Sequence, residues 1–275
     1  SYFAAFRIPD LVFAFLTLFV SSFALVPLLS SRQEKDQGSI IANVLIVFGL
    51  VSILVSAVLW FTVPWLVPKL FPGFSTVELA NTLEMSRIML LQPLLLGLSS
   101  IAASVVQVMR RFVIYALAPI FYNLGIIIGA MFLYPTMGVR GLAWGVVLGA
   151  FLHLMAELIP LLKRGWQVTR PTLASLKISI VEVAYPSVPR ALALSAHNVL
   201  LLAFVSLATL SATGSVSALT LALNLQSVPL TIIGVSYAAA IFPSLSTMFL
   251  NGDKENFTKE VWATIRHIVF WTIPA

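Results

Sequence analysis

Long apolar runs separated by short polar connections recur along the whole sequence. A helix needs roughly 20 apolar residues to cross the hydrocarbon core of a bilayer, and these runs are long and continuous enough to do so. They lack the alternating polarity of strands in outer-membrane barrels. The pattern therefore predicts an all-α polytopic transmembrane bundle with seven full spans and the start of an eighth. The expected helices cover residues 3–30, 40–68, 86–109, 112–134, 141–162, 187–210 and 217–248, and a further helix begins near 260.

The longest polar connection, residues 163–186, predicts a boundary between two lobes. Its polar residues stand among apolar ones, which is typical of an amphipathic segment at a membrane surface. We expect a first lobe over residues 1–168 and a second, truncated lobe over 169–275, as in a two-lobed transporter. Both ends fall inside apolar segments, so we expect both to be cuts in a longer chain. The polar and aromatic residues of the connection are Trp166, Arg170, Lys177 and Glu182.

A short internal repeat supports the division into two lobes. The first span ends in Val26-Pro27-Leu28-Leu29-Ser30, and the seventh ends in Phe242-Pro243-Ser244-Leu245-Ser246. Each is followed by a charged turn and another span. Since both ends are expected on the same side of the membrane, the repeat predicts two parallel halves, a common arrangement in transporters.

Composition and charge place the chain in a membrane and give its orientation. Hydrophobic residues make up 60% of the 275 positions and charged residues 9%, against about 25% charged in soluble domains. The net charge of +6 lies in short loops, so it does not indicate a nucleic-acid partner. One set of alternate loops contains ten Lys and Arg residues, whereas the opposite set and its flanks contain three. This bias predicts that the set with ten is cytoplasmic. The ten are Arg32, Lys35, Arg110, Arg111, Lys163, Arg164, Arg170, Lys177, Lys254 and Lys259, and the three are Lys69, Arg87 and Arg140.

Polar residues inside the spans are the candidates for function, because burying them in hydrocarbon is costly. Arg7 and Asp10 are three residues apart near the expected outer end of the first span, so they share a helix face and could pair. They would form an ion pair at the rim of a cavity. Alternatively, they anchor a helix start at the interface, with Pro9 in the first turn.

The pair His153 and Glu157 also lies on one helix face, four residues apart. A histidine and a carboxylate could relay protons, because histidine titrates near neutral pH. The alternative interpretation, which the sequence favours, is a contact between two helices near the cytoplasmic end of the fifth span.

Amide side chains occur in the sixth and seventh spans. Asn198, beside His197, and Asn224 with Gln226 could tie helices together, as neutral amides often do in bilayers. They could equally line a water-filled cavity. We expect a central cleft between the first and seventh spans, with Arg7, Asp10, Asn198, Asn224 and Gln226 near it as substrate-binding residues.

The fourth and fifth spans carry signals of helix shape and packing. Pro119 removes a backbone hydrogen bond, so Pro119 and Asn123 are either a hinge for a rocking motion or part of a static kink. Glycines four residues apart on both spans predict close helix packing. They are Gly125 and Gly129 in the fourth span, and Gly141, Gly145 and Gly149 in the fifth.

Motifs of enzyme chemistry are missing from the sequence. It has no glycine-rich phosphate loop, no histidines at metal-binding spacing and no aspartate-rich loop. It has no cysteine, so disulfides and thiolate metal sites are excluded. We therefore expect a protein that is not an enzyme, with no catalytic residues, no metal and no cofactor. A coupling ion of unknown identity could still take part in transport.

Three segments resemble one known family, the MurJ/MviN-type lipid II flippases. They are similar to the start of the family's second helix, to its fifth helix and to the end of its eighth, in the right order along the chain. The Phe71-Pro72-Gly73-Phe74 loop also fits the family. The three segments are Ser1-Tyr2-Phe3-Ala4-Ala5-Phe6-Arg7-Ile8-Pro9, Ala116-Leu117-Ala118-Pro119-Ile120-Phe121-Tyr122-Asn123-Leu124-Gly125-Ile126-Ile127 and Gly234-Val235-Ser236-Tyr237-Ala238-Ala239-Ala240-Ile241-Phe242-Pro243-Ser244-Leu245-Ser246.

The resemblance implies helices 2 to 8 and part of helix 9 of a 14-helix flippase that works by alternating access. Its substrate would be lipid II, an undecaprenyl-pyrophosphate-linked peptidoglycan precursor, whose anionic head group enters a cationic cavity. Arginine suits such phosphate recognition. Membrane lipids and this lipid-linked glycan are the expected partners, and we expect a monomer in the bacterial cytoplasmic (inner) membrane. Arg7 matches a basic family position, whereas Phe13 and Asn224 stand where the family commonly has arginines.

These two differences leave other interpretations open. A related transporter of the same superfamily could move other lipid-linked polysaccharide units or drugs. A divergent homologue that does not carry lipid II, a membrane enzyme or a non-transporting structural homologue are further alternatives. The missing first helix and C-terminal helices would distinguish these possibilities best.

Overall fold

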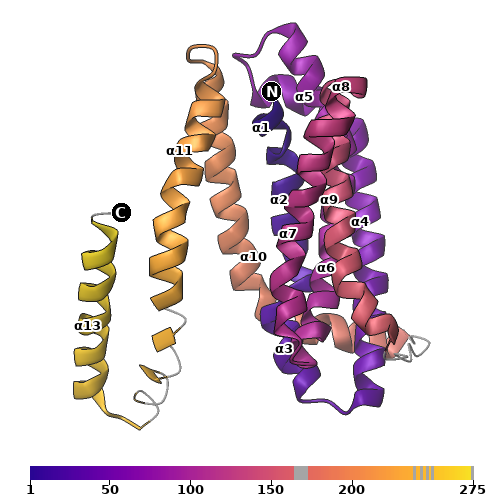
Figure 1. Cartoon of the computed structure of the whole chain (residues 1–275). Coiled ribbons are helices and arrows are strands. Elements are labelled where there is room, and N and C mark those ends of the chain that lie inside the picture. Colours follow the sequence, from indigo (N-terminus) through magenta and orange to yellow (C-terminus); the bar gives the residue numbers. More distant parts are fainter. Residues whose placement is uncertain (164–172, 238–239, 242–243, 246–247, 249–250, 274–275) are drawn as a thin grey trace. The chain divides into compact units, whose positions relative to one another are not determined.

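The computed structural model describes residues 1–275 except 164–172, 238–239, 242–243, 246–247, 249–250 and 274–275. In the described part of the chain, every regular element is a helix (Figure 1). The chain divides into two compact units, Ser1–Thr213 (unit 1) and Gly214–Ala275 (unit 2). The all-α fold class predicted from the apolar runs is therefore confirmed.

Unit 1 contains the helices up to α10. They are α1 (Tyr2–Ala5), α2 (Arg7–Val20), α3 (Ser22–Ser30), α4 (Glu34–Leu70), α5 (Thr76–Met89), α6 (Leu91–Val108), α7 (Phe112–Ile128), the π-helical turn η1 (Gly129–Leu133), α8 (Tyr134–Met137), α9 (Val139–Lys163) and α10 (Leu173–Thr209). Unit 2 contains α11 (Ser215–Pro229), a second π-helical segment η2 (Leu230–Val235) and α13 (Lys254–Thr272).

Seven of the described helical stretches are long and apolar enough to cross a membrane. They are Tyr2–Ser30, Asp36–Leu70, Thr76–Val108, Phe112–Met137, Val139–Leu162, Val181–Thr209 and Ser215–Gly234. Each overlaps one of the seven spans predicted from the sequence. The helix expected near residue 260 begins earlier, at Lys254, where the Asp253 side chain caps it by accepting from the backbone N–H of Asn256 at 3.2 Å.

The structure differs from the predicted helices inside the first span and at the start of the third. The first span is broken at Ser21, whose extended backbone (ψ 116°) separates α2 from α3. The third span begins at Thr76, ten residues before the predicted start. There, Ser75 and Glu78 form a capping box in which each side chain accepts from the other residue's backbone N–H. This Ser-x-x-Glu signal was present in the sequence and was overlooked because the turn that follows it is only weakly apolar.

The polar connection expected over residues 163–186 falls partly outside the described residues. From Leu173 onward it is helical and continues without a break into the sixth span as α10. Within unit 1, α10 packs against α2, α3 and α4. The two units divide at Thr213 and Gly214, and the proposed lobes 1–168 and 169–275 remain a prediction. The repeat between the first and seventh spans also remains a prediction, since Phe242 and Pro243 lie outside the described residues.

The main core of unit 1 lies where α2, α3, α4 and α6 meet. Leu16, Leu25, Leu29 and Phe48 are completely buried there. A second cluster, around Met85 and Met89, joins α5 to α1 and α9. Many apolar side chains on the outer faces of the helices are exposed, as expected for a surface in contact with lipid.

The predicted glycine contact between the fourth and fifth spans is confirmed. A Cβ atom added to Gly125 would lie 2.2 Å from the Cα of Gly149, and one added to Gly129 would lie 2.3 Å from the Cα of Gly145. A Cβ on Gly141 would lie 2.3 Å from the backbone carbon of Leu133. These helices therefore touch backbone to backbone, which only glycine permits.

The membrane-spanning part of α10, Val181–Thr209, is tied near both of its ends to parts of unit 1 that are distant in sequence. At one end, the backbone N–H of Gly73 donates to the hydroxyl of Thr209 at 3.2 Å. At the other, Arg32 forms an ion pair with Glu182 at 2.8 Å. A Cβ on Gly73 would lie 1.9 Å from the carbonyl oxygen of Thr209, so this loop approaches the helix end as closely as glycine allows.

We expect single cysteines at the two kinds of loop to be labelled from opposite sides. The 275 residues contain no cysteine, and Pro72 and Arg110 are both exposed. The bias of ten positive residues against three predicts that Pro72→Cys reacts with an impermeant maleimide added outside intact cells, whereas Arg110→Cys reacts only after lysis. The reverse pattern of labelling would overturn the orientation.

Candidate functional site

Arg7 and Asp10 lie in the first turn of α2. Within the described residues, no salt bridge joins the two side chains. The Nε of Arg7 is buried and has no hydrogen-bond partner. The Ser86 hydroxyl on α5 donates to the carbonyl of Ala5 at 3.1 Å. The backbone just before Arg7 is thus fixed to α5, while the Nε of Arg7 is buried without a protein partner.

The three amide residues of the predicted site lie on two different units. In unit 1, Asn198 is half-buried and its side chain donates to the carbonyl of Leu194, one turn earlier on α10, at 2.9 Å. In unit 2, Asn224 and Gln226 on α11 are exposed. Gln226 lines a hollow of about 600 Å³ whose other lining residues are apolar. The cleft expected between the first and seventh spans remains a prediction.

The predicted hinge at Pro119 lies within α7, which continues through it as α-helix. Asn123 donates its side-chain N–H to the carbonyl of Pro119 at 3.0 Å, so that carbonyl has a side-chain partner. The departure from α-helical geometry comes ten residues later, in the π-helical turn η1. Such turns occur often at functional sites. Any hinge function of Pro119 stays a prediction.

The pair His153 and Glu157 is part of a three-residue cluster that the sequence did not predict. The hydroxyl of Ser99 on α6 lies 2.7 Å from Nδ1 of His153 and donates to Oε2 of Glu157 at 2.5 Å. The distance from that Nδ1 to Oε2 is 3.8 Å. The cluster joins α6 to α9, as the helix-contact interpretation requires. Ser99 was missed because it is 54 residues away from His153 and serine is common in spans.

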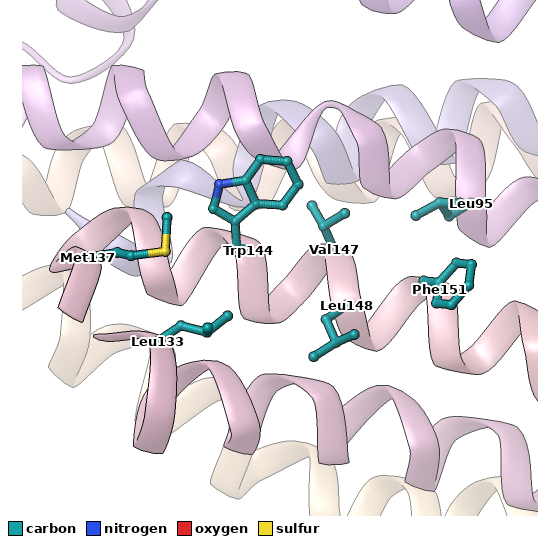
Figure 2. A pocket seen from close by; sticks show the side chains of 7 residues that line it. All are labelled: Leu95, Leu133, Met137, Trp144, Val147, Leu148 and Phe151. Atoms are coloured by element: carbon teal, nitrogen blue, oxygen red, sulfur yellow. The ribbon is translucent and has the colours of Figure 1, made fainter. Parts of the chain in front are cut away.

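An apolar hollow of about 560 Å³ lies on unit 1 between α6, the end of the fourth span and α9. Figure 2 shows its side chains, with Trp144, Val147, Leu148 and Phe151 from α9. Leu95, Leu133 and Met137 complete the lining. With no charged group in its walls, this hollow suits a hydrocarbon chain and not an anionic head group.

A second hollow of about 640 Å³ gathers charged and aromatic side chains at the end of unit 1 that carries α5. Arg87 donates from Nε to the carbonyl of Trp60 at 3.3 Å, and its guanidinium lies 5.4 Å from the centre of that indole ring. Arg140 forms an ion pair with Glu84 in the same hollow. In the sequence these arginines indicated only the orientation of the chain, because their proximity depends on how α5 packs against α9.

Relatives with established names match most of this chain. It is 27% identical over 267 residues to a probable lipid II flippase MurJ of Buchnera aphidicola, and 27% identical over 272 residues to the lipid II flippase MurJ of Burkholderia cenocepacia. In each comparison, 94% of this chain matches 52% of the relative. The chain therefore spans about half the length of the curated relatives it matches.

Two solved structures share the fold. A lipid II flippase MurJ in an inward closed conformation superposes with a TM-score of 0.70 and 21% identity, covering 99% of this chain and 56% of the other. An inward-facing multidrug resistance transporter of the MATE family, in the MOP superfamily, superposes with a TM-score of 0.71 and 16% identity, covering 99% of this chain and 61% of the other. At these identities the structures show the fold alone. The family model described as "Lipid II flippase MurJ" matches residues 1–275, so the chain belongs to the lipid II flippase MurJ family.

Proposed function

We propose that this chain forms part of a flippase that moves lipid II across the membrane by alternating access. The observation that carries the proposal is the match of the MurJ family model over all 275 residues. Seven helices of membrane-spanning length and the common fold with an inward closed MurJ structure support it.

The family and the seven spans make this chain a multi-pass protein of the bacterial inner membrane. The family is named for transport and not for a chemical reaction. A pyrophosphate cannot cross hydrocarbon without polar partners, so a flippase needs a polar route through its helices. In our proposal, Arg7 contributes positive charge to that route, with Asp10, Asn198, Asn224 and Gln226 near it.

Arg7 is suited to this role by its surroundings. Its helix is fixed to α5 by the contact between Ser86 and Ala5, whereas its own Nε has no protein partner. A guanidinium binds phosphate oxygens in a bidentate manner, and a buried donor without a partner gains most from such a ligand. Phe13 and Asn224 offer no charge at the two positions where arginines are usual in the family, which increases the share that Arg7 carries.

A second candidate function is transport of another lipid-linked glycan or of a drug by the same fold. It is favoured by the neutral residues Phe13 and Asn224. In either case we propose that the protein works as a monomer without a cofactor, and that any ion coupling is separate from substrate recognition.

Complementation tests the proposed function. We expect the full-length gene to restore growth and normal cell shape to a bacterium depleted of its own lipid II flippase. Accumulation of lipid II on the cytoplasmic side should fall at the same time. A well-expressed, membrane-inserted protein that leaves the depleted cells to lyse would contradict lipid II as the substrate and favour the second candidate.

A further inference from the structure

A buried cluster of three polar side chains lies between α6 and α9 and includes none of the residues proposed to meet the substrate. The side chains of Ser99 and Glu157 are almost fully buried, whereas that of His153 is 19% exposed. Ser99 is within hydrogen-bonding distance of both partners, at 2.7 Å from Nδ1 of His153 and 2.5 Å from Oε2 of Glu157. The other carboxyl oxygen of Glu157, Oε1, is buried and has no hydrogen-bond partner.

The charges of the cluster determine how many protons it can hold. An ionised carboxylate buried without a compensating charge is strongly unfavourable, and so is a lone imidazolium. The cluster is neutral in two forms only. Either Glu157 carries the proton and His153 is neutral, or Glu157 is ionised and His153 is protonated. Both forms contain a single titrating proton, so the neutral cluster is a site for one proton.

Among the side chains that the structure describes, the neighbouring helices place no other charge in contact with the cluster. α9 packs against α5, α6, α7, η1 and α8, and α6 also packs against α2, α3 and α4. In the described part of these elements, no other titratable side chain forms a hydrogen bond or ion pair with His153 or Glu157. The described charged and titratable side chains of these elements, with Arg111 at the N-cap of α7, are Arg7, Asp10, Asp36, Lys69, Glu78, Glu84, Arg87, Arg111, Tyr115, Tyr122, Tyr134 and Arg140.

We propose that Ser99, His153 and Glu157 form a proton-binding site in which the serine hydroxyl passes one proton between the carboxyl group and the imidazole. As the Oε2–H bond of Glu157 breaks, its proton joins Oγ of Ser99. The proton that Ser99 held leaves Oγ and forms the Nδ1–H bond of His153. The hydroxyl ends as it began, with one hydrogen, now donated toward Glu157. His153 is the member of the cluster that reaches the surface of unit 1, so the proton enters and leaves there.

This geometry does more than a simple tie between two helices would need. A neutral amide at position 157 could bond Ser99 equally well and would carry no charge to be buried. Instead the chain places a carboxyl group with one free oxygen beside an imidazole, joined by a hydroxyl that can both donate and accept. Each proton position reverses the direction of the hydrogen bonds between α6 and α9.

Infrared spectroscopy of the full-length protein in lipid vesicles, without substrate, tests the proposal. We expect a carboxylic-acid C=O band that titrates with pH in step with the His153 ring nitrogens in ¹⁵N NMR. Glu157→Gln should abolish the band. Ser99→Ala should keep the band but uncouple its titration from His153. Ser100→Ala is the matched control, because Ser100 bonds only its own helix, at Leu96, and should change neither signal.

Several outcomes would overturn the proposal. One is an unchanged titration of both groups in Ser99→Ala, which would show that the hydroxyl does not connect them. Another is loss of the acid band when Na⁺ is added at constant pH, which would make the cluster a sodium site. If Glu157→Gln does not fold, His153→Gln gives the same test, since the proton must then stay on Glu157 and the acid band should strengthen. Because substrate is absent throughout, these results are independent of the complementation experiment.

Discussion

Gly145→Ala is expected to lower the free energy of unfolding of the full-length protein by about 1–3 kcal/mol, the usual effect of overpacking a filled interface. The new Cβ would lie 2.5 Å from the Cα of Gly129 and 3.2 Å from the carbonyl oxygen of Gly125. These neighbours are backbone atoms, so they cannot move aside by changing rotamer. α9 must therefore separate from α7, and the contacts along the whole glycine stripe weaken together.

Denaturant titration in mild detergent, followed by tryptophan fluorescence, measures this effect. Gly49→Ala is the matched control, since Gly49 is also inside a spanning helix but a Cβ added to it would have no neighbouring atom within 4 Å. That change should be neutral or stabilising by up to about 1 kcal/mol, because alanine has the higher helix propensity. Equal effects of the two substitutions would show that backbone contact between α7 and α9 is not what holds these spans together.

Arg7→Ala is expected to reduce the rate of lipid II translocation about tenfold or more. A hydrogen bond to a charged group contributes roughly 1.5–3 kcal/mol, and the substitution removes such donors from the head group. Arg7→Lys should retain part of the activity, because it keeps the charge but loses the planar, bidentate donor arrangement. Asp10→Asn should strengthen the positive field and tighten binding of the head group.

Translocation of labelled lipid II in vesicles containing the full-length protein measures these rates, with rescue of flippase-depleted cells as a second readout. Arg111→Ala is the control for loss of a positive charge as such, since Arg111 is exposed at the start of α7. It should transport at the normal rate. Full activity of Arg7→Ala would mean that Arg7 anchors a helix end, and that the substrate's charge is met by other residues.

The spans and the glycine contact could be predicted because each depends on local sequence. Apolar length determines which segments can cross a bilayer, and glycines at four-residue spacing determine where two helices can touch. The break at Ser21 and the start at Thr76 were missed for local reasons too. An apolar run does not reveal where its helix is interrupted, and the capping box around Ser75 lies in a stretch of moderate polarity.

For the candidate sites, the sequence predicted only which residues share a face of one helix. The spacing of His153 and Glu157 placed them on one face of α9, but their connection through Ser99 depends on the packing of α6. Arg7 and Asp10 were correctly placed in one helical turn, yet proximity in sequence did not produce an ion pair. Which residues face each other across a cleft depends on how units of the chain are arranged, and that information is not local.

The contacts near the two ends of the sixth span, Val181–Thr209, impose an order on the assembly of the nascent chain. Gly73 meets Thr209 across 136 residues of sequence, and Arg32 meets Glu182 across 150. Membrane proteins are made from the N-terminus, so the two loops that carry Arg32 and Gly73 reach the membrane long before their partners leave the ribosome. The first five spans are therefore in the membrane before the surface that α10 covers has its partner. When the sixth span is inserted, it makes both contacts together.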